Sequence, residues 1–300
     1  MKLIRPVTIT DAMLVSSSIA EPDSGETAWN SSTTYALDDE IYLASTHRVY
    51  RSKQAANLNK NPVTETAWWL DIGGTNKWAM FDEYVSTAST DTTPLTAVFD
   101  PGIIDALALF NLTGNTATIT MTDGAGGPTV YTRELQLQVP VMGDWYAYYF
   151  EPFRQIPVFV LTDLPPYLNA RVTVAVEGDT TASVGMCIPG RSYTIGDSQY
   201  GVEVGIRDYS RKTTDEDTGF IALEQRHFAK TMQATVRLAS QYFPEVHQQL
   251  EQLRATPCVW IADKTGQSTP MTMFGFYRDF RLVVDYPGLG AYSLDIEGMI

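Results

Sequence analysis

The residues with the widest range of chemistry in this sequence are its three histidines, His47, His227 and His247. An imidazole ring can transfer protons near neutral pH or bind a zinc ion. A zinc site needs three or four ligands at short separations, and no second His or Cys stands at a ligand spacing from any of these residues. The sequence therefore predicts no metal site and no cofactor.

Two further patterns bear on hydrolysis. Residues 196–201 (GDSQYG) place Asp197 beside Ser198, but a nucleophilic serine occupies a sharp turn between a strand and a helix. No helical pattern follows Ser198, so a simple turn is favoured. Glycosidases use two carboxylates whose separation is set by the fold, and nothing in the sequence nominates such a pair. We expect that the protein is not an enzyme; a polysaccharide-degrading enzyme stays as a third alternative because carboxylates are plentiful.

Residues 213–219 (TTDEDTG) have the residue types of a calcium-binding loop. Asp215 and Asp217 match its first two ligand spacings, but the glycine comes one position early. The twelfth position is Arg226, where such a loop has a glutamate. The stretch is therefore predicted to be a solvated acidic loop.

Charge and hydropathy exclude several classes of partner. The 300 residues carry a net charge of -14, without a long block of Lys and Arg. Nucleic acids and anionic membranes attract clustered cations, so neither is an expected partner. No run approaches the roughly 18 apolar residues that predict a membrane span. The first residues, MKLIRPVTITDAMLVSSS, lack the apolar run of a signal peptide.

The two cysteines, Cys187 and Cys258, lie far apart, each in an apolar run typical of a strand. This placement favours buried, reduced thiols over a disulfide. Reduced thiols agree with synthesis in a reducing cytosol.

The elements that must position these residues are mostly strands. Alternating runs at 39–45 and 47–53 predict a hairpin, and the run at 66–73 supplies a third strand. Together they predict a small three-stranded module at residues 25–75, which follows an N-terminal arm at 1–24.

The rest of the chain continues the strand pattern. Residues 117–139 alternate around a Gly-rich turn, which predicts a hairpin. With several further strand runs it predicts a central β-sandwich, jelly-roll-like, at 76–203. Residues 204–300 are predicted to be a β-rich docking part of strand-helix-strand order. The fold class is therefore mainly β.

One helix is expected near 244–255. Pro244 suits the first turn of a helix. Val246, Leu250 and Leu253 follow at i, i+4 and i+7, so they share one apolar face.

A dense run of aromatic residues lies at 144–157 (DWYAYYFEPFRQIP). If this run is a strand, Tyr146, Tyr148 and Phe150 face one side, and Trp145 and Tyr149 face the other. Two interpretations follow. The strand is central and buried on both faces, or the face with Tyr146, Tyr148 and Phe150 forms a contact between subunits, where aromatic residues dominate the energetics.

The small module cannot bury all of its aromatic residues. Tyr35, Ile41, Val49 and Tyr50 take alternating positions that a three-stranded sheet must bury. Trp68 and Trp69 are adjacent, so in a strand they face opposite sides. We therefore expect one of these two tryptophans to face solvent or a neighbouring domain.

The module also follows the order W…Y…D-x-V…Y…P…W, through Trp29, Tyr35, Asp39, Ile41, Tyr50, Pro62 and Trp69. This order resembles the small chitin- and cellulose-binding modules at the ends of bacterial chitinases. Two features depart from that family: Asp38 stands where a glycine normally precedes the aspartate, and residues 51–57 (RSKQAAN) lack an aromatic. The resemblance implies sugar stacking on exposed rings, and the candidates are Trp29, Tyr42, Trp68 and Trp69.

Longer motifs occur along the whole chain: TNKWAMFD (75–82), VGIRDYSRKTTDEDTGF (204–220), LRATPCVWIAD (253–263), YRDF (277–280) and SLDIEGMI (293–300). Together they resemble a group of tailed-bacteriophage virion proteins encoded among the tail-tip genes. The resemblance implies a structural component of a tail tip or baseplate that forms a symmetric ring and contacts other tail proteins. It places the protein in the virion, assembled in the host bacterial cytoplasm. The alternative is a carbohydrate-binding receptor adhesin, whose module contacts a host surface glycan.

Overall fold

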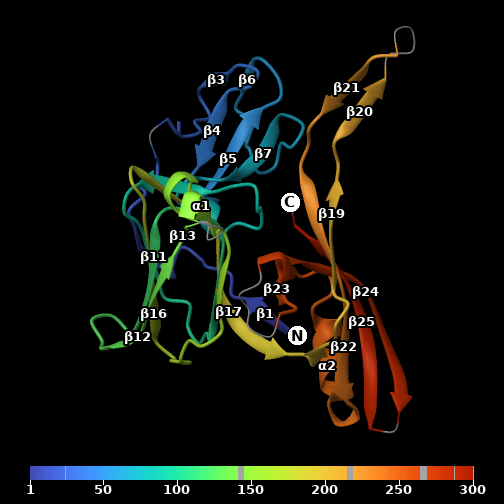
Figure 1. Cartoon of the computed structure of the whole chain (residues 1–300). Helices are drawn as coiled ribbons and strands as arrows, with labels where there is room; N and C mark the ends of the chain where they lie inside the picture. Colours follow the sequence, from blue (N-terminus) through green and yellow to red (C-terminus); the bar gives the residue numbers. More distant parts are fainter. Residues whose placement is uncertain (24, 141–144, 215–218, 264–268, 287, 300) are drawn as a thin grey trace.

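The structure, a computed structural model, describes the chain except residues 24, 141–144, 215–218, 264–268, 287 and 300. The described chain is mainly β, as the sequence predicts. It comprises a body of two sheets, a small module at one end of that body, and a long arm that extends past the module at the right of the view (Figure 1).

The first sheet of the body has five strands, in the order β12-β11-β16-β9-β2. These strands are β2 (Leu14–Ser17), β9 (Leu95–Phe99), β11 (Thr116–Asp123), β12 (Thr129–Gln136) and β16 (Ala170–Glu177). Buried residues alternate along β11 and β16, and the paired residues Ile119 and Val174 contribute to the core between the sheets. The hairpin predicted at 117–139 is confirmed.

The second sheet has eleven strands, in the order β15-β10-β17-β1-β23-β24-β25-β22-β18, with β8 on β17 and β19 on β22. In chain order these are β1 (Lys2–Pro6), β8 (Ser89–Thr92), β10 (Ala106–Thr113), β15 (Phe159–Leu161), β17 (Thr181–Thr194), β18 (Asp197–Ser198), β19 (Glu203–Asp208), β22 (Phe228–Ala239), β23 (Cys258–Ile261), β24 (Thr272–Tyr286) and β25 (Leu289–Gly298). The 14-residue β17 pairs with both β10 and β1. It thereby joins the half that covers the five-stranded sheet to the C-terminal half.

Strand β10 is buried on both faces because it separates two apolar clusters. Leu107 and Leu109 pack in the core with the five-stranded sheet. Ala108 and Phe110 face the other way and pack with Phe274 of β24. Phe110 and Phe274 also line a pocket together with Phe228 of β22.

The predicted helix is confirmed as α2 (Phe243–Gln252), which follows the short turn η2 (Ser240–Tyr242). Its apolar face, with Val246 and Leu250, packs in one cluster with Trp260 and Tyr292 of the large sheet. The Tyr277 hydroxyl donates a hydrogen bond of 2.7 Å to the Leu250 carbonyl. No helix among the described residues is long and apolar enough to span a membrane.

The predicted three-stranded module is present as the sheet β4-β5-β7, with a second pair β3-β6. Its strands are β3 (Thr34–Tyr35), β4 (Glu40–Leu43), β5 (Arg48–Ser52), β6 (Asn57–Leu58) and β7 (Trp69–Gly74). Residues 1–24, expected as an N-terminal arm, supply β1 to the large sheet and β2 to the five-stranded sheet. Two further turns, η1 (Ala79–Phe81) and η3 (Thr269–Met271), precede β8 and β24.

The prediction of a strand in the aromatic run is wrong, because these residues form the helix α1 (Trp145–Phe150). The flanking strands β13 (Gln138–Val139) and β14 (Arg154–Gln155) pair antiparallel. The chain between them must therefore reverse direction, which a strand running straight through 145–150 would prevent. The alternation of Tyr146, Tyr148 and Phe150 on one strand face does not occur.

The arm consists of a stem and an outer hairpin. The stem is β19 paired with the first half of β22, and the outer hairpin is β20 (Arg211–Thr214) paired with β21 (Ile221–Glu224). The acidic loop predicted at 213–219 falls at its outer end, where residues 215–218 lie outside the described residues.

Candidate functional site

Two of the four candidate sugar-stacking residues, Trp69 and Tyr42, are buried. Trp69 is only 2% exposed, its ring packs edge-on against Tyr35 at 5.3 Å, and its Nε1 donates a 2.9 Å hydrogen bond to the Lys60 carbonyl. Tyr42 is also buried. A sugar ring needs an open aromatic face, so neither residue offers a stacking platform in this structure.

The expected core is otherwise present, with Tyr35, Ile41 and Tyr50 packed around Trp69. Val49 is only partly buried.

The other two candidates, Trp29 and Trp68, are partly buried against the same core. The Lys60 ammonium lies 5.2 Å from the centre of the Trp68 ring, in the geometry of a cation–π contact. This cation lies over one face of the ring. Sugar binding by Trp29 and Trp68 stays a prediction.

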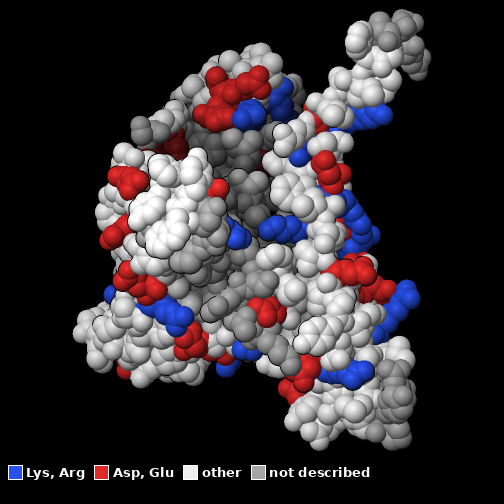
Figure 2. Space-filling view, in the orientation of Figure 1, with Lys and Arg blue, Asp and Glu red and all other residues white. Residues whose placement is uncertain are grey.

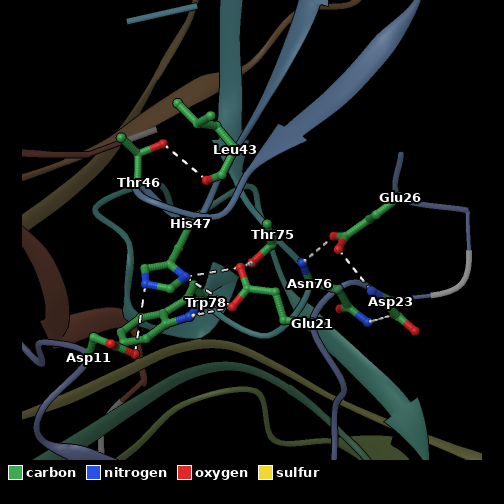
Figure 3. A network of polar contacts seen from close by, with 10 residues as sticks. All are labelled: Asp11, Glu21, Asp23, Glu26, Leu43, Thr46, His47, Thr75, Asn76 and Trp78. Atoms are coloured by element: carbon green, nitrogen blue, oxygen red, sulfur yellow. Dashed lines mark hydrogen bonds and ion pairs between the residues drawn. The ribbon is translucent and has the colours of Figure 1, made fainter. Parts of the chain in front are cut away.

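A polar network holds the module against the body (Figure 3). The Glu21 carboxylate accepts hydrogen bonds from His47 Nδ1 at 2.9 Å, Thr75 Oγ1 at 3.0 Å and Trp78 Nε1 at 3.2 Å. The His47 ring stacks on Trp78 with centroids 4.5 Å apart. His47 Nε2 faces the Asp11 carboxylate at 3.8 Å, at the position where a catalytic triad would hold its nucleophile. The arrangement therefore suits a structural junction better than hydrolysis.

Asn76 extends this junction to the sandwich. Its backbone N–H donates to Glu26 at 3.1 Å, and its amide Nδ2 donates to the Asp23 carboxylate and to the Thr90 carbonyl. The Thr90 N–H returns a 2.8 Å hydrogen bond to Asn76 Oδ1. The two ends of the module and strand β8 are thereby tied at one point, so the module is fixed to the body.

The two thiols are free and buried, as the sequence predicts. Burial raises the pKa of Cys258 to about 12 and also raises the pKa of Cys187. The thiolate is the reactive form, so both residues are inert in the folded chain. Within the part of the chain that the structure describes, no group of three or more His, Cys, Asp or Glu is placed to hold a metal ion.

Helix α1 presents its aromatic side chains to solvent. Trp145 is 79% exposed, and Tyr146 and Phe150 are also exposed. The rings of Tyr146 and Phe150 lie 5.0 Å apart, as expected for i, i+4 neighbours on a helix. The side chain of Tyr148 lies outside the described residues. The interpretation of a central strand buried on both faces is therefore excluded, and a contact between subunits stays a proposal.

The arm exposes a second set of apolar side chains. On the stem, Val204 and Ile206 share a face with Phe228 of the paired strand, and Ile206 is 70% exposed. On the outer hairpin, Ile221 and Leu223 share one face of β21, and Leu223 is 76% exposed. The sequence predicted a β-rich part at 204–300 but missed the arm, because a strand pattern does not reveal whether another layer covers it.

Glu297 anchors the arm to the large sheet. Its carboxylate accepts hydrogen bonds from Arg207 Nη1 at 3.0 Å and the Tyr209 hydroxyl at 2.9 Å, and it pairs with Arg278 at 3.1 Å. A hydrogen bond between Arg207 and Tyr209, together with the negative charge of Glu297, raises the pKa of Arg207 above its ordinary value. The stem is therefore held in one direction relative to β25.

A groove of about 330 Å³ separates the body from the arm stem. The body contributes Val85, Phe110 and Val158, and the other wall contributes Phe228 and Met299. The polar residues His227 and Lys230 also line it. The groove is thus an apolar hollow with a cationic side chain among its lining residues.

The fold and these surfaces define a β-rich protein with a fixed N-terminal module and a projecting arm. Among the described residues, both the arm and helix α1 expose large apolar side chains. No protein-family model matches the chain, and a search of curated proteins found no match.

Proposed function

We propose that this chain is a structural component of a multi-subunit assembly, of the tail-tip or baseplate kind suggested by its motifs, and that it assembles as a symmetric oligomer. The arm is the observation that carries this proposal. It exposes Ile206, Ile221 and Leu223 on a two-stranded ribbon. Exposed apolar strands tend to associate, and native proteins cover or pair them. The arm therefore has the properties of a surface that becomes buried on assembly.

Two other features support a structural role. The Glu21 network ties the module to the body, as a rigid assembly component requires. The aromatic helix α1 supplies a second exposed surface for other tail proteins, and aromatic residues are enriched at the energetic centres of interfaces. The buried, inert thiols agree with assembly in a bacterial cytoplasm before incorporation into the virion.

The second candidate function is a carbohydrate-binding receptor adhesin. It is favoured by the partial exposure of Trp29 and Trp68 at the surface of the module. It is weakened by the burial of Tyr42 and Trp69 and by Lys60 over the Trp68 ring. A glycan array probed with the full chain separates the two. Binding lost in Trp68→Ala would favour the adhesin.

The proposed function is tested by light scattering of the purified full chain over a range of concentrations, with electron microscopy of the same samples. We expect a discrete multiple of the chain mass and particles of closed symmetry. A chain that stays monomeric at all concentrations and forms no particles would overturn self-assembly. The control variant Tyr200→Ser should associate as the wild type does, because Tyr200 is fully exposed and lies outside the arm hairpin.

A further inference from the structure

The turn between β4 and β5 places the His47 side chain at the junction of module and body. His47 has a φ of 54°, a left-handed conformation that residues other than glycine adopt at a cost in free energy. Its N–H donates to the Leu43 carbonyl at 2.9 Å, and the Thr75 N–H donates to the His47 carbonyl at 2.8 Å. The ring points toward Glu21 on one side and Asp11 on the other (Figure 3).

The Glu21 carboxylate determines which ring nitrogen of His47 carries a hydrogen. Glu21 is only 10% exposed and accepts from Thr75 and Trp78 as well as from His47 Nδ1. A carboxylate that accepts these bonds has no hydrogen of its own to donate, so Nδ1 carries the hydrogen of the His47 contact. In a neutral ring the other nitrogen, Nε2, then has a lone pair and no hydrogen.

The Nε2 atom faces a second carboxylate. It lies 3.8 Å from Asp11 Oδ1. A neutral ring would place a lone pair opposite this negatively charged oxygen, whereas a protonated ring places an N–H there and forms an ion pair. Imidazole is the side chain that gains and loses such a proton between about pH 5 and pH 8. The contact between His47 and Asp11 therefore depends on a proton.

The same contact joins the module to the body. Asp11 follows Ile9, which is buried in the core between the two sheets. The Thr10 carbonyl accepts hydrogen bonds from the N–H groups of Met13 and Leu14, so the backbone around Asp11 is held in place. An ion pair between Asp11 and His47 thus links the turn of the module to the connection between β1 and β2.

The other charged groups nearby do not replace His47 as the partner of Asp11. Arg48 and Asp82 line the same cleft, which has a volume of about 220 Å³. Arg48 pairs with Asp71 at 2.6 Å, and Figure 2 shows acidic and basic side chains next to one another over the module. Asp82 is itself an acid, with a pKa raised by burial. Among the described residues, the only ion-pair distance to Asp11 is that from His47.

We propose that His47 is a proton-dependent link between the module and the body. With a proton on Nε2, the ring bridges Glu21 and Asp11. Without this proton, the contact with Asp11 is lost and Glu21 alone holds the ring. The module is therefore held more tightly on the acidic side of neutrality. The link lies within one chain, so it does not depend on self-assembly.

A double-mutant cycle on the full chain tests the link. Asp11→Asn, His47→Gln and the double variant are unfolded in denaturant at about pH 5.5 and about pH 8.5, on either side of most of the range in which imidazole changes charge. Glutamine keeps an amide donor for Glu21 but carries no charge. At the lower pH we expect Asp11→Asn to raise the unfolding equilibrium constant about two- to fivefold, the scale of an exposed ion pair. At the higher pH, and in the His47→Gln background, it should not.

Two further variants serve as controls for this cycle. Asp71→Asn removes an ion pair that contains no histidine, so its effect should be the same at both pH values. The cycle is repeated in Asp82→Asn, because Asp82 lines the same cleft, and the coupling of Asp11 with His47 should persist there. No coupling at the lower pH, equal coupling at both pH values, or coupling that disappears in Asp82→Asn would each overturn the proposal.

Nitrogen NMR of the His47 ring gives a test that does not depend on stability. At about pH 5.5 both ring nitrogens should carry a hydrogen, and at about pH 8.5 only Nδ1 should. Asp11 is 81% exposed, so Asp11→Asn should fold and keep the hydrogen on Nδ1 at the higher pH. A neutral ring that carries its hydrogen on Nε2 would overturn the link, because Asp11 would then have a donor without any added proton.

Discussion

The module and the arm use similar residues in opposite ways. Both are short antiparallel sheets with large apolar side chains, yet the module buries Ile41 and Trp69 while the arm exposes Ile206 and Leu223. The difference is the number of covering layers. The module has a three-stranded sheet and a second strand pair, whereas a two-stranded ribbon has nothing to cover its apolar face. Residue type alone therefore does not determine whether a side chain serves a core or a contact.

Each region also depends on one glutamate for its position. Glu21 receives three hydrogen bonds at the junction of the module and is 10% exposed. Glu297 receives three partners at the base of the arm and is 14% exposed. The partners differ, because those of Glu21 include a Trp and a Thr, and those of Glu297 include two half-exposed arginines.

The largest effect is expected from Trp69→Ala in the module, compared with Leu223→Ala in the arm. Removing the buried indole should cost about 3–5 kcal/mol, from lost burial and the cavity that remains. Truncating the exposed Leu223 should change the free energy of unfolding by less than about 0.5 kcal/mol. Denaturant unfolding of both variants measures the difference. Similar losses would contradict the division into core and contact.

Much of the fold followed from periodicity. The hairpin of β11 and β12, helix α2 and the core of the module all have patterns with buried residues at period 2 or 3.6. Helix α1 did not follow from periodicity, because its aromatic residues favour strands. Only the antiparallel pairing of β13 with β14 requires the chain between them to reverse direction.

The surfaces were harder to predict than the fold. All four candidate sugar-stacking residues are aromatic, so the sequence does not distinguish them, and packing decides which are buried. They are Trp29, Tyr42, Trp68 and Trp69. The groove joins residues from 85 to 299, so no local pattern could reveal it. The Glu21 network likewise joins Glu21, His47 and Trp78 only through the fold.

The second-largest loss of stability is expected from Glu21→Ala. It leaves the donors of Thr75, Trp78 and His47 without their acceptor, which should cost about 1–3 kcal/mol. Glu21→Gln keeps one acceptor oxygen and should cost less. Unfolding by denaturant gives the loss, and hydrogen exchange at residues 75–78 locates it. Unchanged exchange at these residues would show that the network does not hold the module.

A smaller loss of stability is expected from Glu297→Ala at the base of the arm. Arg207 and Arg278 are half exposed, so water can solvate them after the change, and the cost should stay below about 1 kcal/mol. The arm should nevertheless loosen, with faster hydrogen exchange at residues 203–208. A larger loss of stability than in Glu21→Ala would reverse the comparison between the two anchors.

The smallest effects are expected from two aspartates whose pKa values are shifted in opposite directions. Burial raises the pKa of Asp82, beside the module, above its ordinary value, although Tyr84 and Thr87 donate hydrogen bonds to it. Hydrogen bonds from Ser210 lower the pKa of Asp208 in the arm. Carboxyl NMR titration should place the two values on opposite sides of the ordinary value.

The consequence for stability follows from proton linkage. Folded Asp82 holds its proton more tightly than the unfolded chain does, so its contribution is present at low pH and is lost as pH rises through its folded pKa. Folded Asp208 releases its proton more readily, so its contribution is present above the ordinary pKa and is lost as pH falls through its folded pKa. The stability of the wild type relative to Asp82→Asn should therefore fall as the pH rises above the ordinary aspartate pKa of about 4. Relative to Asp208→Asn it should rise with pH below that value and level off above it. Parallel trends in the two variants would show that burial beside the module and exposure in the arm do not set these two carboxyl groups apart.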